Sequence, residues 1–339
     1  MQTLILQEPG SFIADEQAIP DHLQPDEVLV SVKKIGICGT DLHAFRGKQP
    51  FFSYPRILGH ELGVEVVACG EKVEKVIKGD ACAVEPYLYC GKCTACTRGK
   101  TNCCEFLKVY GVHVDGGMKE LMVLPSQLLH SSSKLTFEQL ALVETLGIGA
   151  HAVQRADILP KDIVLVLGAG PIGLSIIQFL QHLGVPIIVA DLDPERLAFC
   201  QKYMQVSAAV NASYENFEDQ IKDSLQGLLP TIVFDATGNA SSMQKAIHLC
   251  SSGGKLILVG LYQGDFTFHD PLFHKKEMSI LSSRNSTRAN FRDIIRDMES
   301  GLINTDTWIT HRLPFSQVAN TFPSLVERRS GLVKAIISL

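Results

Sequence analysis

The sequence predicts an α/β protein of two domains, an irregular β-barrel and a doubly wound parallel sheet. Three observations support this. The chain has 339 residues, which is longer than a domain with a single hydrophobic core usually is. Roughly the first 145 residues form short strand-like runs broken by Gly, Pro and Asp. From residue 161 onward, short apolar runs alternate with helical patterns, which is typical of a parallel sheet covered by helices.

The barrel-like part is predicted from runs such as EVLVSVKKIGICG, GVEVVACGEKV and GDACAVEPYLYC. Each combines β-branched residues with turn-forming residues at its ends. Such short strands leave long connections between them, and loops of this kind often carry functional groups.

The second part is predicted to contain strands at 163–167, 186–190, 231–234, 255–259 and 278–281. Helices are expected at 216–226, 241–250 and 289–300, the last stopped by Gly301. The terminal strand LVKAIISL does not continue this alternation. We therefore expect residues 1–148 to form the barrel-like domain and 149–284 the parallel-sheet domain, with 285–339 returning to complete the first.

Composition argues against several classes of function. The net charge is −5 and 20% of residues are charged, so no basic excess indicates a nucleic-acid or membrane partner. No apolar run approaches the roughly 20 residues that span a bilayer. The start, MQTLILQEPG, lacks the basic and apolar regions of a signal peptide. Ten scattered cysteines suit a reducing compartment, so a cytoplasmic location is expected.

Four cysteines in the run CGKCTACTRGKTNCC predict a structural zinc site. Two consecutive C-x-x-C steps let thiolates converge on one tetrahedral centre, and a fourth closes the shell. A closed shell leaves no open position for a substrate. The expected ligands are Cys90, Cys93, Cys96 and Cys104, with the adjacent Cys103 as the alternative for the last position.

A dinucleotide site is predicted where a strand is followed by GAGPIG and a helix. The glycines allow a tight turn, close approach of backbone to pyrophosphate and close packing of helix on strand. Asp191 ends the next predicted strand, where a carboxylate binds the adenosine ribose and repels a 2′-phosphate, so NAD is favoured. Arg196 nearby could instead hold that phosphate, while Asp193 is better placed to cap the next helix. The predicted cofactor contacts are Gly168, Gly170, Pro171, Ile172, Gly173, Asp191 and Arg196.

A second metal site is predicted from two further loops. GICGTDLHAFRG carries Cys38, Thr40 and His43, and LGHELG carries His60 and Glu61. Thiolate, imidazole and carboxylate are suitable zinc ligands, and three of them with one open position describe a catalytic site. Taken singly, a histidine or cysteine of this kind is more often a packing residue.

With these motifs, the whole chain from residue 1 to 339 resembles the zinc-containing medium-chain dehydrogenases. The resemblance implies a GroES-like barrel, a Rossmann domain, NAD, and two zinc ions per subunit, one catalytic and one structural. It also implies a homodimer or homotetramer with the active site between the domains. Hydride would pass from a secondary alcohol to the nicotinamide. Residue by residue it implies Cys38 and His60 as zinc ligands, Thr40 and His43 as a proton relay, and Cys104 as the last structural ligand.

The third catalytic ligand distinguishes branches of this family. No cysteine lies between Cys104 and Cys200, so the two-cysteine arrangement of alcohol dehydrogenases is excluded. Glu144 stands at that position instead, as in the polyol, sugar and threonine dehydrogenases. Whether Glu144 or Glu61 completes the shell is left open by the sequence. The chain departs from the family pattern at two further positions. The family motif G-H-E-x-x-G ends in glycine where this chain has Val64, and the glycine here is Gly63, one residue earlier. After the glutamate at position 144, the family usually has proline where this chain has Thr145.

The stretches FFSYPR, FHKKE and SSRNST are similar to sugar-acid 5-dehydrogenases, which implies L-galactonate or L-gulonate oxidised at C5. A polyol, a sugar phosphate or L-threonine is the alternative substrate, and a non-catalytic nucleotide-binding regulator is the alternative function. A hexonate needs cationic or amide donors for its carboxylate. The candidates for this contact are Arg46, Lys48, Tyr54, Arg284 and Asn285.

Overall fold

The computed structural model describes residues 1–50, 52–327 and 331–339. Phe51, the first residue of the FFSYPR stretch, lies outside these ranges. The chain divides into two compact units, the first comprising residues 1–145 and 287–339 and the second residues 146–286. The division falls within the 20-residue helix α3 (Phe137–Ala156).

The first unit is built on a seven-stranded, mainly antiparallel sheet. Its strand order is β16 (Ile309–Pro314), β17 (Lys334–Ser338), β3 (Glu27–Ile37), β4 (Glu61–Cys69), β5 (Ala81–Val84) and β9 (Leu129–Ser131). The seventh strand, β8 (Leu121–Pro125), lies outside this order and pairs with β3. The C-terminal strand β17 runs antiparallel to β3. Residues from the end of the chain therefore lie beside the loop that begins at Cys38.

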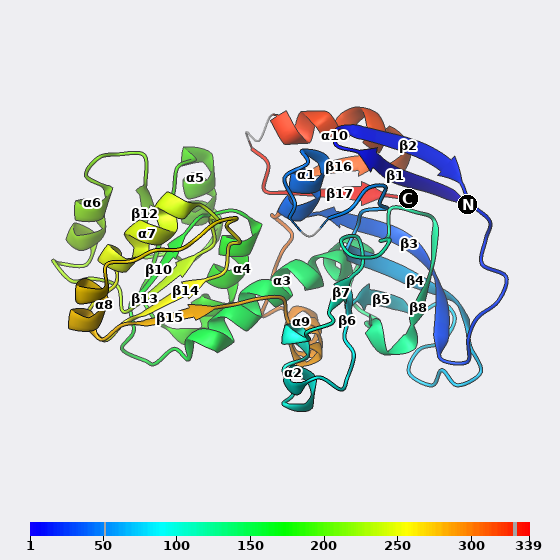
Figure 1. Cartoon of the computed structure of the whole chain (residues 1–339), viewed down its shortest axis with the longest axis horizontal. Coiled ribbons are helices and arrows are strands. Elements are labelled where there is room, and N and C mark those ends of the chain that lie inside the picture. Colours follow the sequence, from blue (N-terminus) through cyan, green and yellow to red (C-terminus); the bar gives the residue numbers. More distant parts are fainter. Residues whose placement is uncertain (51, 328–330) are drawn as a thin grey trace. The chain divides into compact units, whose positions relative to one another are not determined.

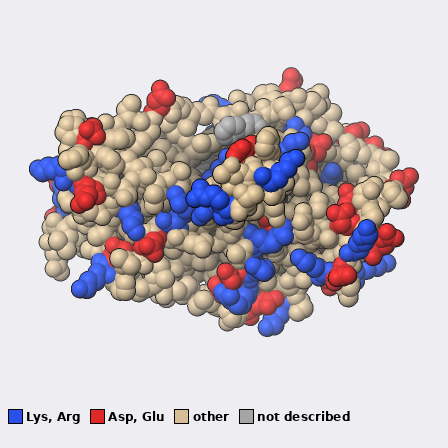
Figure 2. All heavy atoms as spheres, turned by 60° about the horizontal axis from the view of Figure 1, so that its bottom comes forward, with Lys and Arg blue, Asp and Glu red and all other residues tan. Residues whose placement is uncertain are grey.

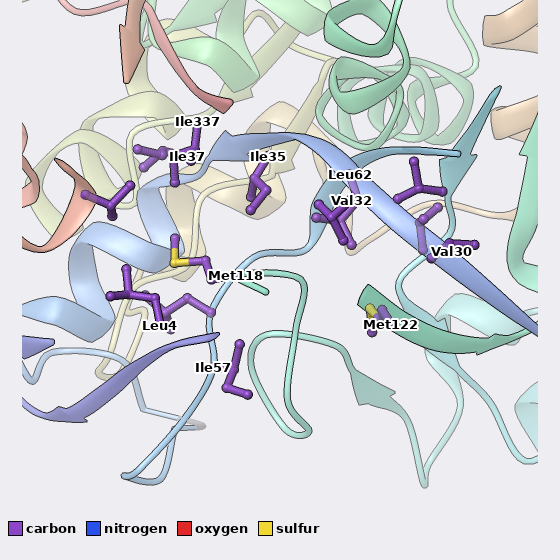
Figure 3. Packing of buried hydrophobic residues seen from close by; sticks show 14 of the residues in the cluster. Leu4, Val30, Val32, Ile35, Ile37, Ile57, Leu62, Met118, Met122 and Ile337 are labelled. Carbon is purple, nitrogen blue, oxygen red and sulfur yellow. The ribbon is translucent and has the colours of Figure 1, made fainter. Parts of the chain in front are cut away.

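The core of this unit is one apolar cluster, seen at close range in Figure 3. Val30, Val32 and Ile35 of β3 are at most 1% exposed, and they share the cluster with Leu62 of β4 and Met118. Burial alternates from Val28 to Val32, as expected for a period of two, and an irregularity between Val32 and Lys34 shifts this phase before Ile35. The rigid sheet fixes the strand ends from which the functional loops start.

Smaller elements complete the first unit. The hairpin β1 (Gln2–Glu8) and β2 (Ser11–Glu16) lies beside α10 (Val318–Glu327) in Figure 1. Helix α1 (Gly39–Phe45) follows β3 directly. The other elements are β6 (Tyr87–Leu88), α2 (Thr94–Thr97), β7 (Lys108–Val109) and α9 (Arg288–Glu299), with short 3₁₀ turns between some of them.

The second unit is a six-stranded sheet in which every neighbouring pair is parallel. Its order is β12 (Ala208–Asn211), β11 (Ile187–Asp191), β10 (Val164–Leu167), β13 (Ile232–Asp235), β14 (Lys255–Leu258), β15 (Ser279–Ser282). The order reverses at β10, and ligands of such sheets bind where the strands at the reversal end. The helices around the sheet are α4 (Pro171–Leu180), α5 (Pro194–Tyr203), α6 (Phe217–Ser224), α7 (Ala240–Leu249) and α8 (Asp270–Lys276) (Figure 1).

The predicted fold class is confirmed, and the predicted strands of the parallel sheet lie within one residue of those observed. In the second unit, β12 and α8 were not predicted. Within the part of the chain that the structure describes, no helix is both long enough and apolar enough to span a bilayer. Both acidic and basic side chains occur across the face shown in Figure 2.

Candidate active site

Three predicted metal ligands come together in the first unit. The ligand atoms of Cys38, His60 and Glu61 lie within 4.8 Å of one another. Cys38 lies between β3 and α1, and Glu61 begins β4, which pairs with β3. The end of β3 and the start of β4 thus hold the thiol, the imidazole and the carboxylate together.

The local backbone explains this arrangement. Cys38 is the N-cap of α1, and its N–H donates to Asp41 Oδ2 at 2.8 Å. Gly36 of β3 pairs with Glu61 across the sheet. A Cβ at residue 36 would lie 2.0 Å from Glu61 Oε2, so only glycine leaves room for the carboxylate. Similarly, a Cβ at residue 63 would lie 2.1 Å from the carbonyl oxygen of Phe137. This close approach explains why the chain has glycine at position 63.

Asp41 is a fully buried partner of this site that the sequence did not reveal. Its Oδ1 lies 3.6 Å from His60 Nδ1. Burial works to lower the pKa of His60, but Asp41 and Cys38 raise it well above its usual value. The carboxylate thus faces the ring at ion-pair distance, without a hydrogen bond between these two atoms.

Glu61 has two buried donors from distant parts of the chain. Thr145 of α3 donates its hydroxyl to Glu61 Oε1 at 2.7 Å. Lys334 of β17 forms an ion pair with the same carboxylate, and both side chains of that pair are 1% exposed. Burial lowers the pKa of Lys334, but Glu61 and then Cys38 raise it above its usual value, so the ammonium stays charged.

Glu144 lies close to this group without being part of it. It is 6% exposed and accepts a hydrogen bond at 2.5 Å from the hydroxyl of Tyr87, a residue of β6. Burial raises the pKa of Glu144, while the charges of His60 and Lys334 oppose that rise. One carboxylate oxygen of Glu144 is therefore engaged by the protein.

The predicted relay residues lie on α1. Thr40 is half-buried and His43 is exposed. Their spacing of three places both on one side of the helix, because residues three apart are neighbours on a helix surface. The helix thus carries a hydroxyl near Cys38 and an imidazole further out toward solvent.

The predicted substrate contacts divide between the two units. The guanidinium of Arg46 donates to the carbonyl of Val326, and the Tyr54 hydroxyl donates to the carbonyl of Ala44. Lys48 is exposed in the same unit. Arg284 and Asn285 belong to the second unit, where Arg284 is exposed and Asn285 has a positive φ of 53°.

The four predicted lobe cysteines form a second cluster. The sulfur atoms of Cys90, Cys93, Cys96 and Cys104 lie within 4.8 Å of one another. The backbone N–H of Cys90 donates to Cys104 Sγ, and that of Cys93 to Cys90 Sγ, both at 3.3 Å. Cys103 is exposed and is not part of the cluster.

Hydrogen bonds to sulfur favour the thiolate form of Cys93, whereas burial and then the hydrogen bond with Cys93 raise the pKa of Cys96 to about 12. Backbone N–H groups of Cys96 and Glu105 lower the pKa of Cys93 to about 6. A metal binds the thiolate rather than the thiol, so such donors support a metal site.

The glycine-rich turn has the geometry that the sequence predicted. Gly168 has a φ of 94°, which side chains rarely adopt. Gly170 is the N-cap of α4, with Pro171 and Ile172 opening the helix. A Cβ at Gly173 would lie 1.8 Å from the carbonyl oxygen of Gly168, so α4 packs on the turn only because residue 173 is glycine.

Asp191 links the end of β11 to this turn. Its Oδ2 accepts from the N–H of Ala169 at 2.6 Å, and its Oδ1 from the N–H of Asp193 at 2.9 Å. Arg196 lies 3.9 Å from Asp191 Oδ2. Asp193 caps α5 by accepting from the N–H of Glu195 at 2.9 Å, as predicted.

Comparison with known proteins agrees with this geometry. Residues 24–134 match the model of the alcohol dehydrogenase GroES-like domain, and residues 171–300 match that of the zinc-binding dehydrogenases. L-galactonate-5-dehydrogenase of Escherichia coli is 40% identical over 338 residues, covering 100% of this chain and 99% of the relative. The chain belongs to the zinc-binding alcohol dehydrogenases.

Two other members of the zinc-binding alcohol dehydrogenases extend the comparison. L-idonate 5-dehydrogenase of Vitis vinifera is 30% identical, covering 87% of this chain and 83% of the relative. A crystal structure of the Escherichia coli alcohol dehydrogenase rspB, complexed with NADH, superposes with a TM-score of 0.93. It is 32% identical and covers 100% of this chain and 99% of its own.

The two side-chain clusters suit the metal for which this family of zinc-binding alcohol dehydrogenases is named. Four sulfur atoms form a soft, closed donor set, which fits zinc better than a hard cation. The mixed set of Cys38, His60 and Glu61 supplies only three protein ligands. Within it, His60 Nδ1 is buried without a hydrogen-bond partner among the described residues.

Proposed function

We propose that this chain is a zinc-dependent, NAD-linked dehydrogenase that oxidises the C5 hydroxyl of L-galactonate or L-gulonate to the keto acid. The observation that carries the proposal is the full-length similarity to L-galactonate-5-dehydrogenase. We assign residues 1–148 and 285–339 to the catalytic domain and 149–284 to the cofactor domain. A cytoplasmic homo-oligomer remains the expectation.

We assign Cys38, His60 and Glu61 as protein ligands of the catalytic zinc, because their ligand atoms converge. Glu144 is assigned as an outer carboxylate, because it is not among the side chains whose ligand atoms converge. Bound zinc would act as a Lewis acid and lower the pKa of a substrate hydroxyl. The open fourth position is what distinguishes this site from the closed cysteine lobe.

The chain must then carry the hydroxyl proton away while water is excluded. Thr40 supplies a half-buried hydroxyl on the first turn of α1, and His43 supplies an exposed base three residues on. We assign Thr40 as the first proton acceptor and donor, and His43 as the group that passes the proton to solvent.

In the second unit, we assign the turn from Gly168 to Gly173 to the pyrophosphate of NAD. The N-terminus of α4 presents N–H groups and a partial positive charge to an anion at this point. Asp191 is assigned to the adenosine ribose, where its charge disfavours NADP. Arg196 is held near Asp191 and Asp193 by opposite charges, which supports NAD as the cofactor.

We assign Cys90, Cys93, Cys96 and Cys104 to a structural zinc that stabilises the lobe around α2. For the substrate carboxylate we favour Arg284 with the adjacent Asn285. Arg46, Lys48 and Tyr54 are the other candidates, and Arg46 and Tyr54 each donate to a main-chain carbonyl of their own unit.

The assay is NADH formation from L-galactonate, L-gulonate, sorbitol and L-threonine at equal concentrations. We expect a hexonate to be oxidised fastest. Arg284→Gln should raise KM for the hexonate by the roughly 1.5–3 kcal/mol of a charge-assisted hydrogen bond, about 10- to 150-fold, and leave KM for sorbitol unchanged. Faster oxidation of sorbitol or threonine by the wild-type enzyme would contradict the substrate assignment while leaving the fold in place.

A further inference from the structure

Thr145 is a buried polar residue that the proposed function does not use. It follows Glu144 on α3, is 1% exposed, and donates its hydroxyl to Glu61 Oε1 at 2.7 Å. Lys334 approaches the same carboxylate from β17. Two donors from distant parts of the sequence thus converge on one side chain.

A hydroxyl at this position needs an explanation. Threonine is no better a helix former than valine, which has the same shape without the polar group. Burying a hydroxyl is unfavourable unless it forms a hydrogen bond. The hydrogen bond to Glu61 offsets that cost, so the position is suited to holding the carboxylate rather than to building the helix.

The space around Glu61 leaves the carboxylate little freedom. Gly36 lies against Oε2, where any Cβ would be 2.0 Å away. Lys334 contacts both oxygens, and Thr145 fixes Oε1. The neighbouring side chains therefore restrict the rotation of the carboxylate that faces Cys38 and His60 in the same cluster.

We propose that Thr145 is a positioning residue for the catalytic metal, acting through Glu61. The inference rests on the proposed role of Glu61 as a ligand and deepens it. A ligand that is already oriented loses less freedom when the ion binds, and partners of this kind typically contribute 10- to 100-fold to metal affinity. The hydroxyl of Thr145 thus sets how firmly the catalytic site retains zinc.

The test compares Thr145→Val, which removes only the hydroxyl, with Thr145→Ser, which keeps it. Thr3→Val is a matched control, because Thr3 is also 1% exposed and its hydroxyl has no hydrogen-bond partner among the described residues. Zinc affinity of the full-length protein is measured by competition with a chelator. The visible spectrum of the cobalt-substituted site reports its coordination.

We expect Thr145→Val to lower zinc affinity about 10-fold and to change the cobalt spectrum. Thr145→Ser and Thr3→Val should match the wild type in both. Thr145→Ala provides a second hydroxyl-free variant if valine prevents folding, with circular dichroism as the check.

Wild-type affinity and an unchanged spectrum in Thr145→Val would overturn the proposal. So would a loss in Thr145→Ser equal to that in Thr145→Val, because the position would then act by shape alone. Failure of the proposed function looks different: wild-type protein and Cys38→Ser would bind the same amount of zinc, and no site would exist for Thr145 to support.

Discussion

Replacing Gly173 with alanine tests the dinucleotide turn most sharply. The added Cβ would lie 1.8 Å from the carbonyl oxygen of Gly168 and 2.9 Å from its carbonyl carbon. Both are backbone atoms, so relief requires α4 to move away from the turn that follows β10. Overpacking of this kind costs up to about 3 kcal/mol, and the higher helix propensity of alanine returns about 1 kcal/mol. We therefore expect a net loss of about 2 kcal/mol in unfolding free energy.

Gly170→Ala is the matched control. A Cβ there would meet only Arg196 Nη1, at 3.5 Å, and the backbone φ is −75°, which alanine adopts readily. Its stability should stay within about 0.5 kcal/mol of wild type. NADH affinity should nevertheless fall, because the pyrophosphate of the cofactor must approach the backbone of this residue closely.

Chemical denaturation and NADH fluorescence titration measure the two effects separately. Gly173→Ala should lose both stability and NADH affinity, the latter by about tenfold or more, which corresponds to at least about 1.4 kcal/mol. Gly170→Ala should lose affinity only. Wild-type stability and affinity in Gly173→Ala would refute the reasoning, as would a Gly170→Ala variant that binds NADH normally.

Three further predictions follow from single side chains. Asp191→Ser should narrow or reverse the preference of the enzyme for NAD over NADP, measured as the ratio of kcat/KM values, and a wild-type enzyme that prefers NADP would refute the ribose assignment. His43→Ala should reduce turnover most at low pH, and added buffer should partly restore it. Thr40→Val should reduce turnover further, and buffer should not restore it. A loss in His43→Ala that does not depend on pH would indicate that His43 has a packing role instead. Arg312 and then Lys34 hold the pKa of Glu138 below its ordinary value of 4.5, so its contribution to stability is present above that pH and lost as the pH falls through the lowered pKa. The difference in melting temperature between wild type and Glu138→Gln should therefore disappear at acid pH, and a difference that persists there would contradict this account.

The regular parts of the fold were predictable because their signals are local. The run that forms β10 is wholly apolar and leads into a turn with three glycines. Few local structures other than a buried strand followed by a tight turn fit this pattern. Strand β12 escaped prediction because it has only four residues, AAVN, with weak strand propensity. Helix α8 was noted only through the stretch FHKKE, although Pro271 at its first turn is a helix-start signal.

The partners of the site were harder to predict because they depend on distant contacts. Lys334 lies 273 residues from Glu61, and only the sheet brings them together. Its signal was a lysine inside an otherwise apolar terminal strand, since lysine is rarely buried unless it is paired. Asp41 gave no such signal, because an acid in the first turn of a helix is ordinary. The sequence showed Thr145 as a departure from the family pattern, but it did not show that Thr145 contacts Glu61.

The zinc content of the purified protein tests the central claim that the chain builds two different metal sites. We expect two zinc ions per chain in the wild type. Cys38→Ser should retain one, stay folded and lose activity, because its site serves catalysis. Cys93→Ser should instead lose stability, because a structural ion contributes directly to folding. A single zinc per wild-type chain, lost together with Cys38, would contradict the account.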